Sequence, residues 1–219
     1  MKSTLIYSHI IGGVIVLLTG IIAMLIQPKG NKLHKRIGLI YYFTMIYVAL
    51  SSVVSMLLFD FFFFLFPIAI FSFHLVYSGF RATKQAKTNT IAWYDWLVAY
   101  GTFLIGFALF GYGVNVIYCE NNMPLAILSM VFGLFIALSG FGDVKIYKKL
   151  QEQGKMWWWF HHMRGMLGSY IAAFTAFLVQ NGEYFHWGNA QIILWVAPGV
   201  LGGFGIGIWS KYYREKFKV

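Results

Sequence analysis

Long apolar segments alternate with short basic clusters along the whole chain, and this alternation restricts the possible fold more than any other feature. A membrane helix needs about 20 largely apolar residues to cross the hydrocarbon core of a bilayer. Seven segments meet this requirement, and we predict membrane spans at Thr4–Ile26, Ile37–Phe59, Phe61–Phe80, Trp96–Tyr118, Pro124–Val144, Trp158–Gln180 and Ala190–Trp209. The expected fold is all-α: one transmembrane domain over residues 1–219, built as a seven-helix bundle.

The composition fits lipid better than water as the solvent of this chain. Apolar residues make up 59% of the 219 residues and charged residues 11%, whereas soluble domains carry about 25% charged residues. The net charge of +10 could indicate nucleic-acid binding in a soluble protein, but here the basic residues lie between apolar segments. We therefore expect the lipid bilayer as a partner and no nucleic acid. Cys119 is the single cysteine, which excludes an intrachain disulfide or a multi-cysteine metal site.

The Lys and Arg residues occupy every second segment between the predicted spans. Fifteen of the 17 follow the first, third, fifth or seventh span, whereas the other connections contain Asp60, Glu120 and Glu183 but no Lys or Arg. Basic residues concentrate on the cytoplasmic side of membrane proteins. The pattern predicts an odd number of spans, with the N-terminus outside and the C-terminus in the cytoplasm.

Small residues recur at helical spacing in three of the predicted spans. Such residues allow close contact between helices in lipid, and we expect them to form packing seams within the bundle. They are Ser129, Gly133, Ala137 and Gly140 in the fifth span, Gly165, Gly168, Ala172 and Ala176 in the sixth, and Gly199, Gly203 and Gly207 in the seventh, with Gly202 and Gly205 beside them.

Ionisable side chains at membrane depth are costly and therefore mark candidate functional sites. Six such groups lie at similar depth near the predicted cytoplasmic face: His34, His74, Asp143, His161, His162 and Arg164. His161 and His162 are about 100° apart on a helix, so they cannot contact the same partner. We expect Asp143 to balance the charge of Arg164, with the phosphate of a lipid or ligand as the alternative partner.

This cluster is compatible with three functions. In the first, imidazoles from two helices bind haem b for electron transfer. The cofactor-binding residues would then be His74, His161, His162 and Arg164. In the second, a divalent metal such as zinc supports hydrolysis of a lipid. The metal ligands would then be His34, His74, His162 and Asp143. In the third, the protein is a non-catalytic accessory or transport protein, and the histidines are structural or carry protons. Motif spacing does not decide among them, because the chain has no H-x-x-x-H, H-E-x-x-H or C-x-x-C sequence.

Two short blocks resemble a bacterial family of predicted membrane proteins, domain of unknown function 2306. The first is Leu33–Gly38 with Tyr41 and the following Ser51-Ser52, and the second is His162–Tyr170 with Thr175–Phe177. The resemblance implies a multi-pass protein of the bacterial inner membrane. It also implies that four residues of the blocks belong together: His34, His162, Arg164 and Ser169. The family has no established activity that could be transferred to this chain.

Overall fold

The computed structural model describes residues 2–59, 66–120, 122–185 and 192–218. In these ranges the chain forms seven α-helices, two short 3-10 helices and no strand. The α-helices are α1 (Lys2–Leu25), α2 (Lys32–Phe59), α3 (Phe66–Thr88), α4 (Trp93–Cys119), α5 (Met123–Lys148), α6 (Trp157–Gln180) and α7 (Ile192–Phe217). The 3-10 helices are η2 (Leu150–Glu152) and η3 (Gly182–Phe185). The prediction of an all-α fold is confirmed.

Each predicted span corresponds to one helix, but several helices extend further toward the basic connections than predicted. The clearest cases are α3, which ends at Thr88, and α7, which ends at Phe217. Lys, Arg and Gln are good helix formers, so a helix continues where its apolar segment has ended. The predicted first residues of the third and seventh spans, Phe61 and Ala190, lie outside the described residues.

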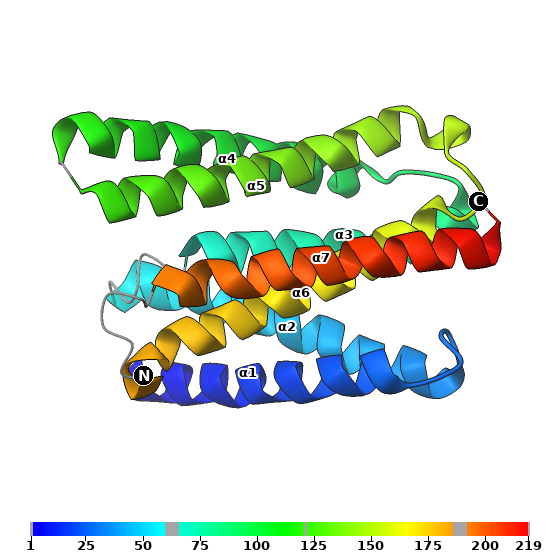
Figure 1. The fold of residues 1–219 in the computed structure, drawn as a ribbon, viewed down its shortest axis with the longest axis horizontal. Coiled ribbons are helices and arrows are strands. Elements are labelled where there is room, and N and C mark those ends of the chain that lie inside the picture. Colours follow the sequence, from blue (N-terminus) through cyan, green and yellow to red (C-terminus); the bar gives the residue numbers. More distant parts are fainter. Residues whose placement is uncertain (1, 60–65, 121, 186–191, 219) are drawn as a thin grey trace.

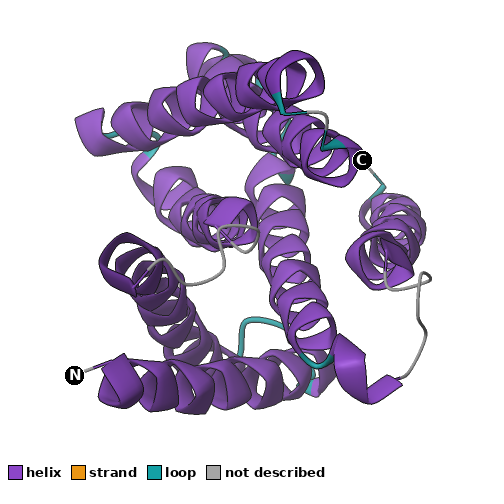
Figure 2. Cartoon of the chain, turned by 90° about the vertical axis from the view of Figure 1, so that its left-hand side faces the viewer, coloured by secondary structure: helices purple, strands orange, loops and turns teal. Residues whose placement is uncertain are grey.

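The helices run side by side along the long axis of the molecule (Figure 1). The pair α4 and α5 lies on one side, the pair α1 and α2 on the other, and α3 and α6 pack against each other between them. Helix α7 packs mainly on α6 and lies at the edge of the bundle (Figure 2). Leu194 is the one buried residue of α7 among those whose side chains are described.

The basic connections gather at one end of the bundle. The turns from α1 to α2, from α3 to α4 and from α5 to α6 lie at the end where the chain terminates, whereas the N-terminus lies at the opposite end (Figure 1). The alternation of charge along the sequence thus corresponds to a separation of charge in space.

Five helices are long and apolar enough to cross a membrane by length and composition: α1, α2, α4, α5 and α7. Within the described residues, α3 and α6 do not meet the same requirement. These two helices are central, and each buries polar side chains against its neighbours, among them His74 on α3 and Ser169 on α6. A helix covered by other helices needs less apolar surface than one that faces lipid on most sides.

Glycines bring helix backbones into direct contact at the predicted seams of α5 and α6. A methyl group added at Gly133 would lie 2.5 Å from the backbone nitrogen of Phe110 on α4. One added at Gly165 would lie 2.6 Å from the carbonyl oxygen of Leu75 on α3. Only glycine permits such an approach, so both predictions are confirmed at these positions.

The predicted seam of α7 is wrong for the three glycines at spacing four. Methyl groups added at Gly199, Gly203 or Gly207 would meet no atom within 4 Å. Instead, Gly202 packs on α6, where an added methyl group would lie 2.3 Å from Ile171. The spacing of four identified a real small-residue face, but the adjacent glycine is the one that faces the bundle.

Candidate functional site

Asp143 is a buried carboxylate near the basic end of α5. It lies five residues before the end of that helix at Lys148, or about 8 Å at 1.5 Å per residue, and its side chain is 4% exposed. Its Oδ2 atom accepts a hydrogen bond of 2.5 Å from Ser78 Oγ on α3. The hydroxyl of Tyr147, one turn along α5, lies 3.5 Å from the same oxygen.

Two histidines from different helices flank this carboxylate. His74 Nε2, on α3, lies 3.5 Å from Oδ2 of Asp143. His161 Nε2, on α6, lies 3.1 Å from Oδ1. The second ring nitrogen of His74 is hydrogen-bonded to Thr102 Oγ1 on α4, at 3.0 Å. Side chains of α3, α5 and α6 therefore meet at Asp143, and α4 joins them through His74.

The hydrogen bonds around Ser78 define the position of one proton of His161. A serine hydroxyl has one proton to donate, and Ser78 donates it to Asp143. The 2.6 Å contact between Ser78 Oγ and His161 Nε2 then requires the imidazole to be the donor. When Asp143 is ionised, His161 therefore carries a proton at Nε2, the nitrogen that faces Ser78 Oγ and Asp143 Oδ1.

A second buried carboxylate, Asp95 at the start of α4, is neutralised in a different way. Arg81 Nε lies 2.7 Å from its Oδ1 and the Arg81 Nη2 atom 2.9 Å from its Oδ2. Tyr77 donates a further hydrogen bond of 2.9 Å to Oδ1. A guanidinium group stays charged in proteins, so the pair of Arg81 and Asp95 is permanent.

Asp143 has no such permanent partner. Across the described ranges, the ion pairs of Asp143 are those with His74 and His161, and no Lys or Arg lies within ion-pair distance of it. A carboxylate removed from water is strongly unfavourable unless its charge is balanced. The charge of Asp143 is therefore balanced by a proton, either on one of the two imidazoles or on the carboxylate itself.

The structure separates the other predicted site residues from this carboxylate. His162 bonds through Nδ1 to the carbonyl oxygen of Gly79, at 2.9 Å. His34 bonds through Nδ1 to the carbonyl oxygen of Ala23, at 3.2 Å. Both histidines are thus satisfied by backbone carbonyls, and the different partners of His161 and His162 confirm that they do not share a site.

The predicted ion pair between Asp143 and Arg164 is wrong. Arg164 is exposed and donates from Nε to the carbonyl oxygen of Phe160, at 3.2 Å. His74 and His161 occupy the two oxygens of Asp143 instead. In the described part of the chain, no three His, Cys, Asp or Glu side chains are arranged to hold a metal ion.

Sequence reasoning missed the neutral polar members of the site, namely Ser78, Thr102 and Tyr147. Serine, threonine and tyrosine are common in helices, so their presence in an apolar segment does not by itself indicate a site. Two of them nevertheless follow a titratable residue by four positions, Ser78 after His74 and Tyr147 after Asp143. Residues at this spacing share a helix face, and this was the available signal.

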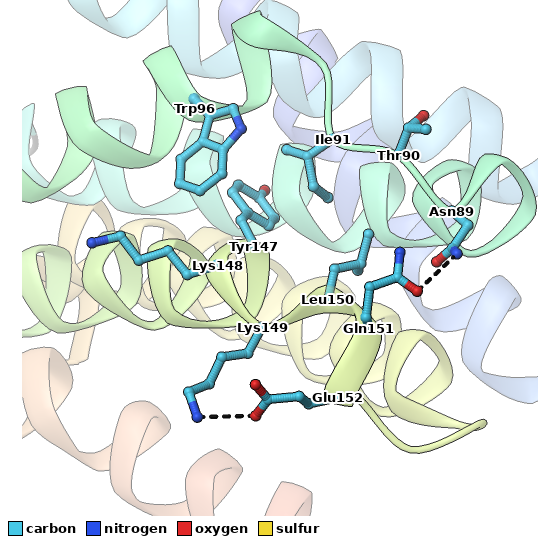
Figure 3. Close-up of a pocket in the computed structure, with 10 residues that line it drawn as sticks. All are labelled: Asn89, Thr90, Ile91, Trp96, Tyr147, Lys148, Lys149, Leu150, Gln151 and Glu152. Atoms are coloured by element: carbon cyan, nitrogen blue, oxygen red, sulfur yellow. Dashed lines mark hydrogen bonds and ion pairs between the residues drawn. The ribbon is translucent and has the colours of Figure 1, made fainter.

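A surface pocket of about 430 Å³ opens beside the site, between the α3–α4 turn and the end of α5. Its lining includes Asn89, Thr90, Trp96, Tyr147 and Gln151 (Figure 3). Tyr147 packs edge to face on Trp96, with ring centroids 5.4 Å apart. Because the Tyr147 hydroxyl also approaches Asp143, this side chain connects the pocket to the buried carboxylate.

Smaller polar contacts join other helices. The hydroxyl of Tyr41 on α2 bonds to Ser169 Oγ on α6, at 2.7 Å, which links the two blocks that resemble the bacterial family. Near the opposite end, His9 Nδ1 bonds to Ser51 Oγ at 2.8 Å. These pairs hold helices together and involve no second titratable group.

No family model, curated protein or solved structure matches this chain. The resemblance to domain of unknown function 2306 stays a prediction.

Proposed function

We propose that this membrane protein binds and releases protons at Asp143, His74 and His161, as the proton site of a proton-coupled transport protein. The observation that supports this proposal is the composition of the site: a buried carboxylate contacts two imidazoles and no permanent cation. Imidazoles exchange protons with water near neutral pH. The charge of the site therefore depends on its protonation.

With both imidazoles neutral and Asp143 ionised, the site has a charge of −1. One additional proton, shared among the three groups, makes the site uncharged. Removal of that proton makes the site negative, and addition of another makes it positive. Either charge is unfavourable at membrane depth. A compensating ion or a charged substrate would lower this cost, and this is the physical basis for coupling proton binding to transport.

Protons reach the site from the basic end of the bundle. The side chain of His161 is 15% exposed, whereas those of Asp143 and His74 are 4% and 1% exposed. His161 is thus the most exposed of the three titratable groups of the site. Tyr147 provides a second path, because it lies in the wall of the pocket and its hydroxyl is 3.5 Å from Asp143.

The proposal includes the predicted topology. All seven helices cross the membrane, with the basic end in the cytoplasm and the N-terminus outside, in the inner membrane of a bacterium. Helices α3 and α6 cross between the pair of α1 and α2 and the pair of α4 and α5. The support is the collection of the basic connections at one end of the bundle and the positive-inside rule.

No specific observation favours haem b or a zinc hydrolase. The Nε2 atoms of His74 and His161 both face Asp143, and α3 and α6 are in backbone contact between Leu75 and Gly165. A porphyrin between these histidines would require the two helices to separate. Of the four residues predicted to bind a metal, His74 and Asp143 contact each other, whereas His34 and His162 bond to backbone carbonyls.

Infrared difference spectroscopy of the protein in liposomes tests the proposal. Between about pH 5 and pH 8, where imidazoles titrate, the wild-type spectrum should change in its carboxyl and imidazole bands. Asp143→Asn should remove the changes in the carboxyl bands. Glu152→Gln, which alters an exposed carboxylate paired with Lys149, is the matched control and should preserve them. A wild-type protein whose spectrum is constant over this range, or an unchanged difference spectrum in Asp143→Asn, would overturn the proposal.

A further inference from the structure

Arg164 on α6 and Arg214 on α7 form a second cluster at the basic end of the bundle, away from Asp143. The two side chains are close enough for their positive charges to repel each other. Both are exposed, and among the described residues neither forms an ion pair with a carboxylate. Arg81, in contrast, has Asp95 as its partner.

Phe160 connects the two arginines. Arg164 donates from Nε to the Phe160 carbonyl oxygen, at 3.2 Å, and the Arg214 guanidinium lies over the Phe160 ring, 5.5 Å from its centroid. These contacts use one N–H group of Arg164 and a face of Arg214. The remaining N–H groups of both guanidiniums stay available to a ligand.

An unmatched hydroxyl lies at the same level of the helix pair. Helices α6 and α7 are antiparallel, with Phe160 opposite Arg214 and Ile171 opposite Gly202. Arg164 lies four residues after Phe160 on α6, and Ser210 lies four residues before Arg214 on α7. In this antiparallel register, Arg164 and Ser210 are therefore at the same level. The Ser210 hydroxyl is buried and, in the described part of the chain, has no hydrogen-bond partner.

The aromatic residues around the cluster match the depth of lipid headgroups. Trp159 packs on Tyr213, with ring centroids 4.6 Å apart, and on Phe217 at 5.0 Å. Trp and Tyr concentrate where the hydrocarbon core meets the headgroups. The face of α7 turned away from α6 is exposed along its length, so a lipid can approach the junction of α6 and α7 from the side.

We propose that Arg164 and Arg214 bind the phosphate of an anionic phospholipid at the junction of α6 and α7. Guanidinium groups bind phosphate through paired charge-assisted hydrogen bonds, and a phosphate between the two arginines replaces their repulsion by two attractions. The buried hydroxyl of Ser210, which has no hydrogen-bond partner among the described residues, is a further donor at this level of the helix pair. The acyl chains lie along the exposed surface of α7.

Native mass spectrometry of the protein, released from micelles that contain equal amounts of phosphatidylglycerol and phosphatidylcholine, tests this site. The wild type should retain phosphatidylglycerol in preference to phosphatidylcholine. Arg164→Gln and Arg214→Gln should each weaken that binding about tenfold or more, since a hydrogen bond to a charged group is lost. Arg164→Lys should weaken it less, because the charge is kept.

Lys145→Gln is the matched control, because Lys145 is also a cation over an aromatic ring, Phe141, at the same end of the bundle. It should retain the lipid as the wild type does. Inorganic phosphate, added to lipid-free protein at the same concentration, should not raise its melting temperature, whereas phosphatidylglycerol should. Equal retention of the two lipids by the wild type, equal loss in Lys145→Gln, or stabilisation by inorganic phosphate alone would each overturn the proposal. The wild-type comparison decides the matter even if an arginine variant fails to fold.

Discussion

His161 on α6 lies 3.1 Å from the carboxylate of Asp143 on α5, although α5 packs mainly on α4 and α6 packs mainly on α3 and α7. Ser78 of α3 contacts both of them. Asp143, His161 and Ser78 therefore join three helices, and the charges of the carboxylate and the imidazole depend on pH. The nearby pair of Arg81 and Asp95 joins α3 to α4 through charges that do not.

The two buried carboxylates should respond differently to neutralisation. Asp95→Asn leaves Arg81 without its counter-ion. We expect the free energy of unfolding to fall by about 3–5 kcal/mol at any pH from about 5 to 8. Asp143→Asn leaves two imidazoles that can be neutral, so its cost should be small at the upper end of this range. The cost should grow as the pH falls, because a protonated imidazole then loses its carboxylate. Unfolding in detergent at several pH values measures both, and a pH-independent loss in Asp143→Asn would contradict the assignment.

Removal of the Tyr147 hydroxyl should slow proton exchange at the site. Tyr147→Phe keeps the ring packed on Trp96 but removes the hydroxyl near Asp143, so only the path through His161 remains. We expect a severalfold slower infrared response after a rapid pH jump, with the same final spectrum. Tyr212→Phe, an exposed tyrosine at the same end, serves as the control. Identical rates in the wild type and Tyr147→Phe would exclude this path.

The contact of α3 with α6 should not tolerate a side chain at Gly165. Gly165→Val places carbon atoms within 2.6 Å of the Leu75 backbone, and overpacking of this kind costs about 1–3 kcal/mol or more. Gly142→Val is the control, because an added methyl group there meets nothing within 4 Å. Melting temperatures in detergent should fall for the first variant only. A similar fall in both would mean that helix propensity, not the contact, sets the result.

The native cysteine offers a direct test of topology. Cys119 is exposed at the end of α4, opposite the basic end of the bundle (Figure 1). A membrane-impermeant maleimide should label it on intact spheroplasts. In a Cys119→Ser background, Gln151→Cys, placed at the exposed basic end, should react only after permeabilisation. Labelling of both cysteines from the same side would refute the orientation.

The helical fold could be predicted from the sequence because lipid imposes a simple requirement on length and polarity. All seven predicted segments correspond to helices, and the charge alternation matches the separation of basic connections in the structure. The ends could not be predicted as well. Segments such as residues 81–88 are helical but not apolar, and hydropathy does not report on helical propensity.

The site was only partly predictable. Their similar depth along the helices placed His74, Asp143 and His161 at one level of the bundle, and in the structure both histidines contact Asp143. It did not show which way each side chain faces, so Arg164 was assigned to Asp143, whereas His161 is the residue that reaches it. That choice depends on the rotation of α6 about its axis, which is set by its backbone contact with α3 at Gly165. A contact between two helices distant in sequence is not visible in either helix alone.

The central position of α3 and α6 also has a consequence for biosynthesis. In the proposed topology, helix α3 is made before α5 and α6, so His74 and Ser78 would enter the bilayer before the chain has supplied Asp143 or His161. The polar face of α3 must then be covered by α2, by water or by the insertion machinery until two later helices arrive. Completion of the polar site is thus tied to the translation of α6, and a chain that stops after α5 exposes to lipid the surface that a finished molecule hides.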